Sequence, residues 1–181
     1  MQMILCAFFA ALTAVLSQIA VPLPFTPVPV NLATLSVFLS GALLGAKYGA
    51  LSQLLFVLLG GIGLPVFSQF TGGLGTLAGP TGGYLIGYIL ASLVTGLLTH
   101  TALASQGSIG GKGLIRSILA MTAGLVVCYA LGTAWFLYVT GVGLVEAFLL
   151  CILPFLPGDA LKIILAASLV RRLSRWVKVN G

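Results

Sequence analysis

The sequence is poor in charged residues. Only eight Lys or Arg and two Asp or Glu occur among 181 residues, which is 6%, whereas a soluble domain carries about a quarter. So few charges cannot cover a water-exposed surface, and this excludes a soluble enzyme or a nucleic-acid-binding domain. Cysteine is also scarce. Cys6, Cys128 and Cys151 lie in apolar runs without CxxC spacing, so we interpret them as buried hydrophobic residues and expect no metal site.

Motifs for catalysis and nucleotide hydrolysis are missing. The chain has no GxxxxGK[ST] loop, no GxSxG or HExxH motif, and no cluster of carboxylates and histidines. We therefore expect neither an enzyme nor a bound cofactor, and no ATP hydrolysis by the chain itself. Met1 to Ala20 lacks a basic n-region, so it is expected to be a retained first span rather than a signal peptide.

Apolar residues make up 60% of the chain. At about 20 residues per membrane-spanning helix, the length allows about six spans and no second domain. The predicted fold is an all-α membrane protein with six transmembrane helices in a single domain, residues 1–181. The predicted spans are Met3–Ala20, Leu32–Ala46, Tyr48–Gly60, Tyr84–Leu98, Leu114–Val139 and Asp159–Val170. Three apolar loops, residues 23–30, 62–78 and 142–155, are expected to dip into the membrane.

The basic residues and the prolines predict how the spans are oriented. Seven of the eight basic residues fall at one end of this arrangement, which indicates the cytoplasmic side and places both termini there: Lys47, Lys112, Arg116, Arg171, Arg172, Arg175 and Lys178. All eight prolines fall at the opposite end: Pro22, Pro24, Pro27, Pro29, Pro65, Pro80, Pro154 and Pro157. Proline blocks helix continuation, so we predict a structured, irregular, apolar cap over the outer half. It is either a ligand lid or a set of stiff turns.

Asp159 and Lys162 are the most informative pair of residues. They are three residues apart at the outer start of the last span, so they share a helix face. Ionisable groups at this depth usually face a cavity and mark a substrate or ion pathway. The alternative is a mutually neutralised pair that orients the span. If the pair binds a ligand, an acceptor and several donors in an apolar pocket suit a small amphipathic molecule.

Small residues form two further patterns. The segment from Gly72 to Tyr84 contains six glycines and could wrap a ligand or act as a hinge. Four alanines of the first span, spaced i, i+3, i+4 and i+7, form a stripe along which another helix can approach closely: Ala7, Ala10, Ala11 and Ala14. Internal packing and a partner helix remain equal alternatives for this stripe.

Four segments together resemble the BioY family, the biotin-specific substrate-binding (S) components of energy-coupling factor (ECF) transporters. They are PFTPVPVN from Pro24, GIGLPVF from Gly61, LAGPTGGYLIG from Leu77 and LPFLPGDALK from Leu153. The resemblance extends through nearly the whole chain. Asn31 stands where the family usually has Gln.

This resemblance implies a six-helix receptor in the bacterial plasma membrane. It would capture biotin from outside and deliver it by associating with a transmembrane coupling (T) subunit and two cytoplasmic ATPase subunits, with no nucleic-acid partner. The alanine stripe would contact the coupling subunit. Asp159 would accept hydrogen bonds from the ureido N–H groups, and Lys162 would donate to the ureido oxygen or to the carboxylate. The expected biotin-binding residues are Asp159, Lys162, Asn31, Thr26, Gly73, Gly82, Gly83, Tyr84 and Phe155.

A stand-alone secondary transporter of a small amphipathic vitamin is the nearest alternative function. Coupling to an ion gradient usually needs membrane-embedded carboxylates. Asp159 is the only carboxylate at a suitable position, because the other, Glu146, is expected in an outer loop.

Overall fold

The computed structural model describes residues 1–104 and 111–173. Arg175 and Lys178 of the predicted basic tail, and the side chain of Lys112, lie outside the described part. The helices are α1 Gln2–Gln18, α2 Ala33–Gly61, α3 Leu74–Ala78, α4 Gly82–Ala104, α5 Gly111–Thr140, α6 Leu144–Cys151 and α7 Leu156–Leu173. One 3-10 turn, η1 Ser68–Phe70, and two strands, β1 Ala20–Leu23 and β2 Thr26–Asn31, complete the described structure.

The membrane-spanning potential is unequal among these helices. Within the described residues, α4 and α5 are each long and apolar enough to cross a membrane, and so is α2 when its 29 residues are counted together across the break at Gly45. Helices α6 and α7, bent by 50°, are a possible further span. Helix α1 is apolar but has 17 residues. The structure is therefore a mostly helical, multi-pass membrane protein, as the composition predicts.

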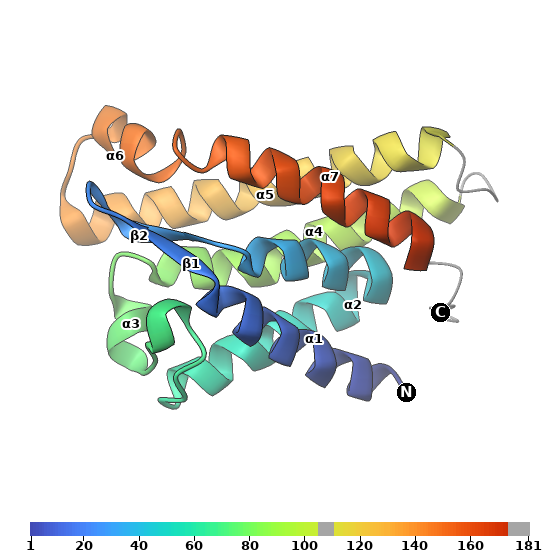
Figure 1. Ribbon diagram of the computed structural model, residues 1–181, viewed down its shortest axis with the longest axis horizontal. Coiled ribbons are helices and arrows are strands. Elements are labelled where there is room, and N and C mark those ends of the chain that lie inside the picture. The colour runs from blue at the N-terminus through green and yellow to red at the C-terminus, as the bar shows by residue number, and fades with distance from the viewer. Residues whose placement is uncertain (105–110, 174–181) are drawn as a thin grey trace.

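Helix α2 doubles back on itself at Gly45. This residue has φ 82° and ψ 175°, a conformation that is accessible to glycine and unfavourable for other residues. Gln53 Nε2 lies 3.0 Å from Ser40 Oγ, whereas 13 residues of straight helix would separate them by about 20 Å. The chain therefore forms two adjacent arms, as Figure 1 also shows. The sequence predicts a helix break here, after Ala46, and the structure places it one residue earlier.

The predicted cap is more regular than expected, because its first loop is a β-hairpin. Antiparallel β1 and β2 pair Ala20 with Asn31, Val21 with Val30 and Leu23 with Thr26, so the all-α prediction needs this correction. Both strands are edges, where proline is tolerated because not every N–H group is needed. The register shifts between Val21 and Leu23, at the position of Pro22.

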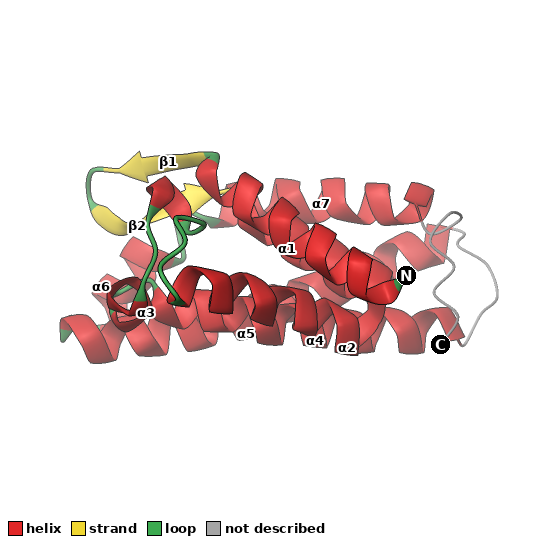
Figure 2. Ribbon diagram, turned by 90° about the horizontal axis from the view of Figure 1, so that it is seen from below, coloured by secondary structure: helices red, strands yellow, loops and turns green. Residues whose placement is uncertain are grey.

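The two ends of the bundle differ in structure. The start of α1 and the end of α7 lie at one end, and the hairpin, α3 and α6 lie at the other (Figures 1 and 2). The break in α2, the start of α5 and the end of α7 carry Lys47, Arg116, Arg171 and Arg172. The prolines lie in or beside the hairpin, α3 and the α6–α7 connection. This separation agrees with the predicted grouping of basic residues and prolines.

Candidate functional site

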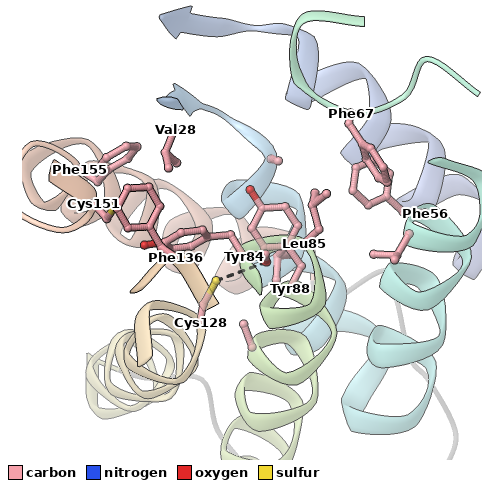
Figure 3. Packing of buried hydrophobic residues seen from close by; sticks show 14 of the residues in the cluster. Val28, Phe56, Phe67, Tyr84, Leu85, Tyr88, Cys128, Phe136, Cys151 and Phe155 are labelled. Carbon is pink, nitrogen blue, oxygen red and sulfur yellow. Dashed lines mark hydrogen bonds between the residues drawn. The ribbon is translucent and has the colours of Figure 1, made fainter. Parts of the chain in front are cut away.

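A cavity of about 200 Å³ lies beneath the hairpin at the capped end. Its apolar and aromatic wall comes from β2, the segment after α2, helices α4, α5 and α6, and the turn between α6 and α7: Pro27, Val28, Pro29, Phe67, Tyr84, Leu85, Tyr88, Leu125, Cys128, Cys151 and Phe155. Figure 3 shows Phe155 and Cys151 to one side of Leu85 and Tyr88, and Phe67 to the other. A mostly apolar pocket with a few converging polar groups is the usual form of a small-molecule site.

The polar part of the wall is centred on the Asp159 carboxylate. Its Oδ1 accepts hydrogen bonds from Lys162 Nζ at 2.8 Å and from Thr34 Oγ1 at 3.1 Å. Its Oδ2 accepts a hydrogen bond from the Tyr129 hydroxyl. These donors come from α7, α2 and α5, so three helices meet at this one group. Asp159 and Lys162 are only 2% and 5% exposed.

The position of Asp159 follows from the local sequence. The segment from Pro154 to Gly158 interrupts the chain between α6 and α7, which places Asp159 in the first turn of α7. The N-terminal end of a helix favours a negative side chain because the helix dipole is positive there. Lys162 follows one turn later on the same face and forms the buried ion pair with Asp159.

This cluster keeps hydrogen-bonding capacity for a ligand. A carboxylate offers about four acceptor positions and an ammonium group three donors. Among the described residues, Asp159 accepts three hydrogen bonds and Lys162 donates one. Burying charges is costly unless they are paired and further hydrogen-bonded. A ligand carrying both donors and acceptors therefore fits this part of the cavity.

Asn31 fixes a second polar region of the cavity. Its Nδ2 donates to Ser68 Oγ at 2.7 Å, and its Oδ1 accepts from the backbone N–H of Ala33 at 3.0 Å. The side chain therefore joins the end of β2 both to the start of α2 and to the loop that follows α2. Asn31 and Ser68 both line the cavity.

Five of the nine residues predicted to bind the ligand line this cavity: Asp159, Lys162, Asn31, Tyr84 and Phe155. The other four have local structural roles in the cap and are not among the lining residues: Thr26, Gly73, Gly82 and Gly83.

Each of the four residues away from the cavity wall has a visible packing or turn role. Thr26 Oγ1 accepts a hydrogen bond from the Val28 N–H. Gly73 precedes α3 with φ 90°. A Cβ on Gly82 would lie 1.7 Å from the Leu77 carbonyl oxygen, and one on Gly83 would lie 2.2 Å from Trp135 Cβ. The glycine-rich segment lines the cavity through its threonines instead.

Several polar lining residues were missed in the sequence: Thr34, Ser68, Gln69, Thr71, Thr76, Thr81 and Tyr129. Thr34 and Tyr129 are 125 and 30 residues away from Asp159, and each looks like an ordinary residue of an apolar span. The only local signal was a hydroxyl group within a predicted helix. Their role depends on the tertiary contact.

The alanine stripe of α1 divides between the interior and the surface. Ala10 is 2% exposed and belongs to the core, and Ala14 is half-buried against it. Ala7 and Ala11 are exposed, beside the exposed Ile4 and Phe8. The four alanines therefore do not form one uniform surface, and only Ala7 and Ala11 are fully available to a partner.

The fold and the site together define a multi-pass helical membrane protein with a ligand-sized, partly open cavity at one end. In the part of the chain that the structure describes, no group of three or more His, Cys, Asp or Glu residues could hold a metal ion.

Comparisons with known proteins identify the family. The BioY family model matches residues 1–179, and the chain therefore belongs to the BioY family. It is 39% identical over 175 residues to the biotin transporter BioY of Rhizobium etli, covering 94% of this chain and 91% of the relative. It is also 39% identical over 175 residues to the biotin transporter BioY of Thermotoga maritima, covering 96% of both chains.

A solved structure agrees with this assignment. The S-component for biotin from an ECF-type ABC transporter superposes with a TM-score of 0.83 at 31% sequence identity, covering 96% of this chain and 90% of that chain. The fold of the described helices and hairpin is therefore that of an S-component.

Proposed function

We propose that this protein captures biotin with high affinity at the outer membrane face. The observation that carries the proposal is the buried Asp159–Lys162 pair, joined at 2.8 Å, on the wall of a cavity that is otherwise largely apolar. The names of the relatives and of the solved S-component supply the identity of the ligand.

The proposed ligand suits the chemistry of the wall. The ureido group of biotin has two N–H donors and one carbonyl acceptor, which match the spare acceptor position on Asp159 and the spare donors on Lys162. Its thioether ring and aliphatic chain would contact Tyr84, Tyr88 and Phe155. The acceptor for Lys162 is either the ureido oxygen or the carboxylate of biotin.

The proposed receptor has six spans, both termini in the bacterial cytoplasm and the capped end outside. Five of these spans would be α1, the two arms of α2, α4 and α5, and α7 preceded by α6 would be the sixth. The basic residues at the uncapped end support this orientation, because cytoplasmic ends of membrane proteins are enriched in Lys and Arg.

Uptake is proposed to require a coupling subunit and two ATPase subunits. The sequence has no nucleotide-binding loop of its own, and the superposed structure comes from an ECF-type ABC transporter. The exposed Ala7 and Ala11 are the proposed contact with the coupling subunit, because small residues let two helices approach closely.

Equilibrium titration of the purified protein with biotin, desthiobiotin and thiamine tests the ligand. Biotin is expected to bind and to stabilise the fold by about 2.7 kcal/mol at 100 times its Kd. Thiamine, which lacks the ureido group, is the negative control. Equal binding of biotin and thiamine, or no thermal stabilisation by biotin, would refute biotin capture.

Replacing both Ala7 and Ala11 by Leu tests the partner surface. The added side chains should block close approach of a partner helix and abolish ATP-coupled uptake, while biotin binding by the isolated protein is retained. Ala134→Leu, at an exposed position of α5, is the matched control and should preserve uptake. Loss of biotin binding in the double variant would indicate an internal packing role instead.

The same purified chain, reconstituted alone in proteoliposomes, tests the secondary-transporter alternative. Sustained accumulation of biotin without any ATPase would favour that alternative. The proposed function predicts binding without accumulation.

A further inference from the structure

The loop between α2 and α3 covers one side of the cavity. We call residues 62–73 the capping loop. Four of its residues line the cavity: Phe67, Ser68, Gln69 and Thr71. Figure 2 shows this loop rising from the level of α2 towards the hairpin and the end of α1. A ligand bound in the cavity would therefore lie directly beneath it.

The capping loop has one apolar anchor. Phe67 is 1% exposed and packs edge-on against Phe56, with 5.5 Å between ring centroids. The following residues Gln69, Phe70 and Thr71 are exposed. Phe67 therefore anchors the loop to the core, whereas apolar packing contributes little to holding residues 69–71 in place.

Gln18, in the last turn of α1, binds the loop backbone on both sides of its exposed turn. Its Nε2 lies 3.1 Å from the carbonyl oxygen of Val66 and 3.0 Å from that of Phe67. Its Oε1 accepts a hydrogen bond from the Phe70 N–H at 2.9 Å. Next to it, Ser17 Oγ donates to the Val66 carbonyl oxygen at 2.6 Å. The side-chain amide of Gln18 therefore binds the backbone on both sides of Ser68 and Gln69.

The turn held in this way has an unfavourable backbone conformation. Gln69 and Phe70 have φ values of 60° and 56°, in the left-handed region that residues other than glycine and asparagine rarely adopt. Such a conformation persists only where surrounding contacts hold it. The hydrogen bond from Phe70 to Gln18 is formed at one of these two residues.

We propose that Gln18 is a positioning residue that holds the capping loop closed over the ligand cavity and thereby controls how fast ligand enters and leaves. The hydrogen bonds of Gln18 are made to the protein backbone, so they are available with and without ligand. They also join the loop to α1, the helix that carries Ala7 and Ala11. This inference rests on the proposed function, because its kinetic test uses biotin.

The variant Gln18→Met tests the proposal, since Met keeps the length of the side chain but has neither donor nor acceptor of comparable strength. Losing one or two net hydrogen bonds should raise the opening frequency of the loop about tenfold. The association and dissociation rate constants for biotin should both rise by about this factor. The Kd should change less than threefold, because the loop is destabilised equally in both states. Gln2→Met, at the opposite end of α1, should leave both rate constants unchanged.

Hydrogen exchange provides a reading that does not depend on biotin. In the ligand-free Gln18→Met protein, amides of residues 66–73, including that of Phe70, should exchange faster, while those of α4 and α5 are unchanged. If the parent protein does not bind biotin, the proposed function fails, and the exchange experiment still decides the role of Gln18.

Two kinetic results would overturn the proposal. One is a pair of rate constants within twofold of the parent values. The other is a weaker Kd with an unchanged or slower association rate, which would indicate a ligand contact or a general packing defect. If Gln18→Met does not fold, Ser17→Ala is the second variant. It removes the bond to Val66 together with the Ser17 contacts to the Ala14 carbonyl and Gln18 Nε2, but it keeps the bonds of Gln18 to the loop, so both rate constants should rise by a smaller factor. Unchanged rates in that variant would equally refute the role of this contact.

Discussion

Buried polar side chains gather in two places in this protein, and their hydrogen bonding differs. Between α1, the arms of α2 and α4, the side chains of Thr13, Ser36, Ser40, Ser52, Gln53 and Ser92 are 0% exposed. Gln53 Nε2 donates to Thr13 and Ser40, and Gln53 Oε1 accepts from Thr13. Around Asp159, by contrast, the polar groups border open space and retain donors and acceptors.

The contrast indicates what makes a buried polar cluster a ligand site. In the packed cluster the side chains satisfy one another, which stabilises one arrangement of the helices. In the cavity cluster the polar groups face a cavity that residues of the hairpin, α6 and the capping loop also line, and the unused hydrogen-bonding capacity can recognise a ligand. Changes at the cavity should therefore alter affinity, and changes in the packed region should alter stability.

Asp159→Asn is expected to have the largest effect on affinity. The amide cannot accept at both terminal atoms and leaves Lys162 without its ionic partner. Losing a buried, hydrogen-bonded charge partner costs about 2 to 5 kcal/mol, so biotin affinity should fall by tens to thousands fold. Calorimetric titration measures this loss.

The control for this change is Glu146→Gln, because it removes the same charge from an exposed position in α6. Affinity should be unaffected. If a folded Asp159→Asn protein binds biotin as tightly as the parent, Asp159 is not part of the binding site. The two polar clusters would then not differ in function.

Tyr129→Phe should have a smaller effect on the same cluster. It deletes the hydroxyl that donates to Asp159 Oδ2, and hydrogen bonds to charged groups contribute about 1.5 to 3 kcal/mol. Because the carboxylate loses one of three donors that orient it, we expect biotin affinity to fall about tenfold. Equilibrium binding measures the change. Tyr138→Phe on the same helix, where the side chain is 82% exposed, should bind as the parent does, and a loss of affinity in both variants would contradict a specific role for Tyr129.

Tyr129 also illustrates which part of the site the sequence could predict. Asp159 and Lys162 stand out because charge is rare in an apolar span and because their spacing puts them on one helix face. Tyr129 and Thr34 carry no such signal, and their function comes from helices that meet only after folding. The glycines at 73, 82 and 83 do carry a signal, and it predicted ligand contact, but they are not among the residues that line the cavity. Glycine marks close backbone approach, which serves turns and helix packing as well as ligand contact.

The fold was predictable where hydrophobicity alone determines it. Apolar runs located α1, both arms of α2, α4, α5 and α7, and the predicted break after Ala46 located the reversal of α2. The short helices α3 and α6 were not predicted, because they fall in segments that the sequence analysis interprets as loops. The hairpin was missed because its prolines, at positions 22, 24, 27 and 29, favour irregular structure by local propensity. Pairing between β1 and β2 overrides that propensity. The alanine spacing on α1 identified a helix face but not which of its residues the other helices bury.

Gly41→Ala tests the packed region. A Cβ at this position would lie 2.4 Å from the Ser92 carbonyl oxygen, a backbone atom, so α2 and α4 would have to separate. Overpacking of this kind costs about 1 to 3 kcal/mol. Thermal or denaturant unfolding should show the loss, while the folded protein binds biotin within threefold of the parent.

Gly75→Ala in α3 is the matched substitution, since a Cβ there meets nothing within 4 Å. Its stability should equal or slightly exceed that of the parent, because alanine favours the helix. If Gly41→Ala weakened biotin binding more than it lowered stability, the two regions would not be separable in function.

Thr95→Val should have the smallest effect, and its sign is informative. Among the described residues the buried Thr95 hydroxyl has no hydrogen-bond partner, so the isosteric apolar side chain removes an unsatisfied polar group. We expect the free energy of unfolding to rise by about 1 kcal/mol. Thr13→Val makes the same chemical change where the hydroxyl lies within hydrogen-bond distance of the Phe9 carbonyl oxygen and of Ser36 Oγ, at 2.7 and 2.9 Å, and it should lower stability by a similar amount. Opposite signs in the two unfolding measurements would show that hydrogen bonding, rather than burial of a hydroxyl, stabilises the packed cluster. Destabilisation by both variants would instead mean that the Thr95 hydroxyl is hydrogen-bonded, for example to a buried water.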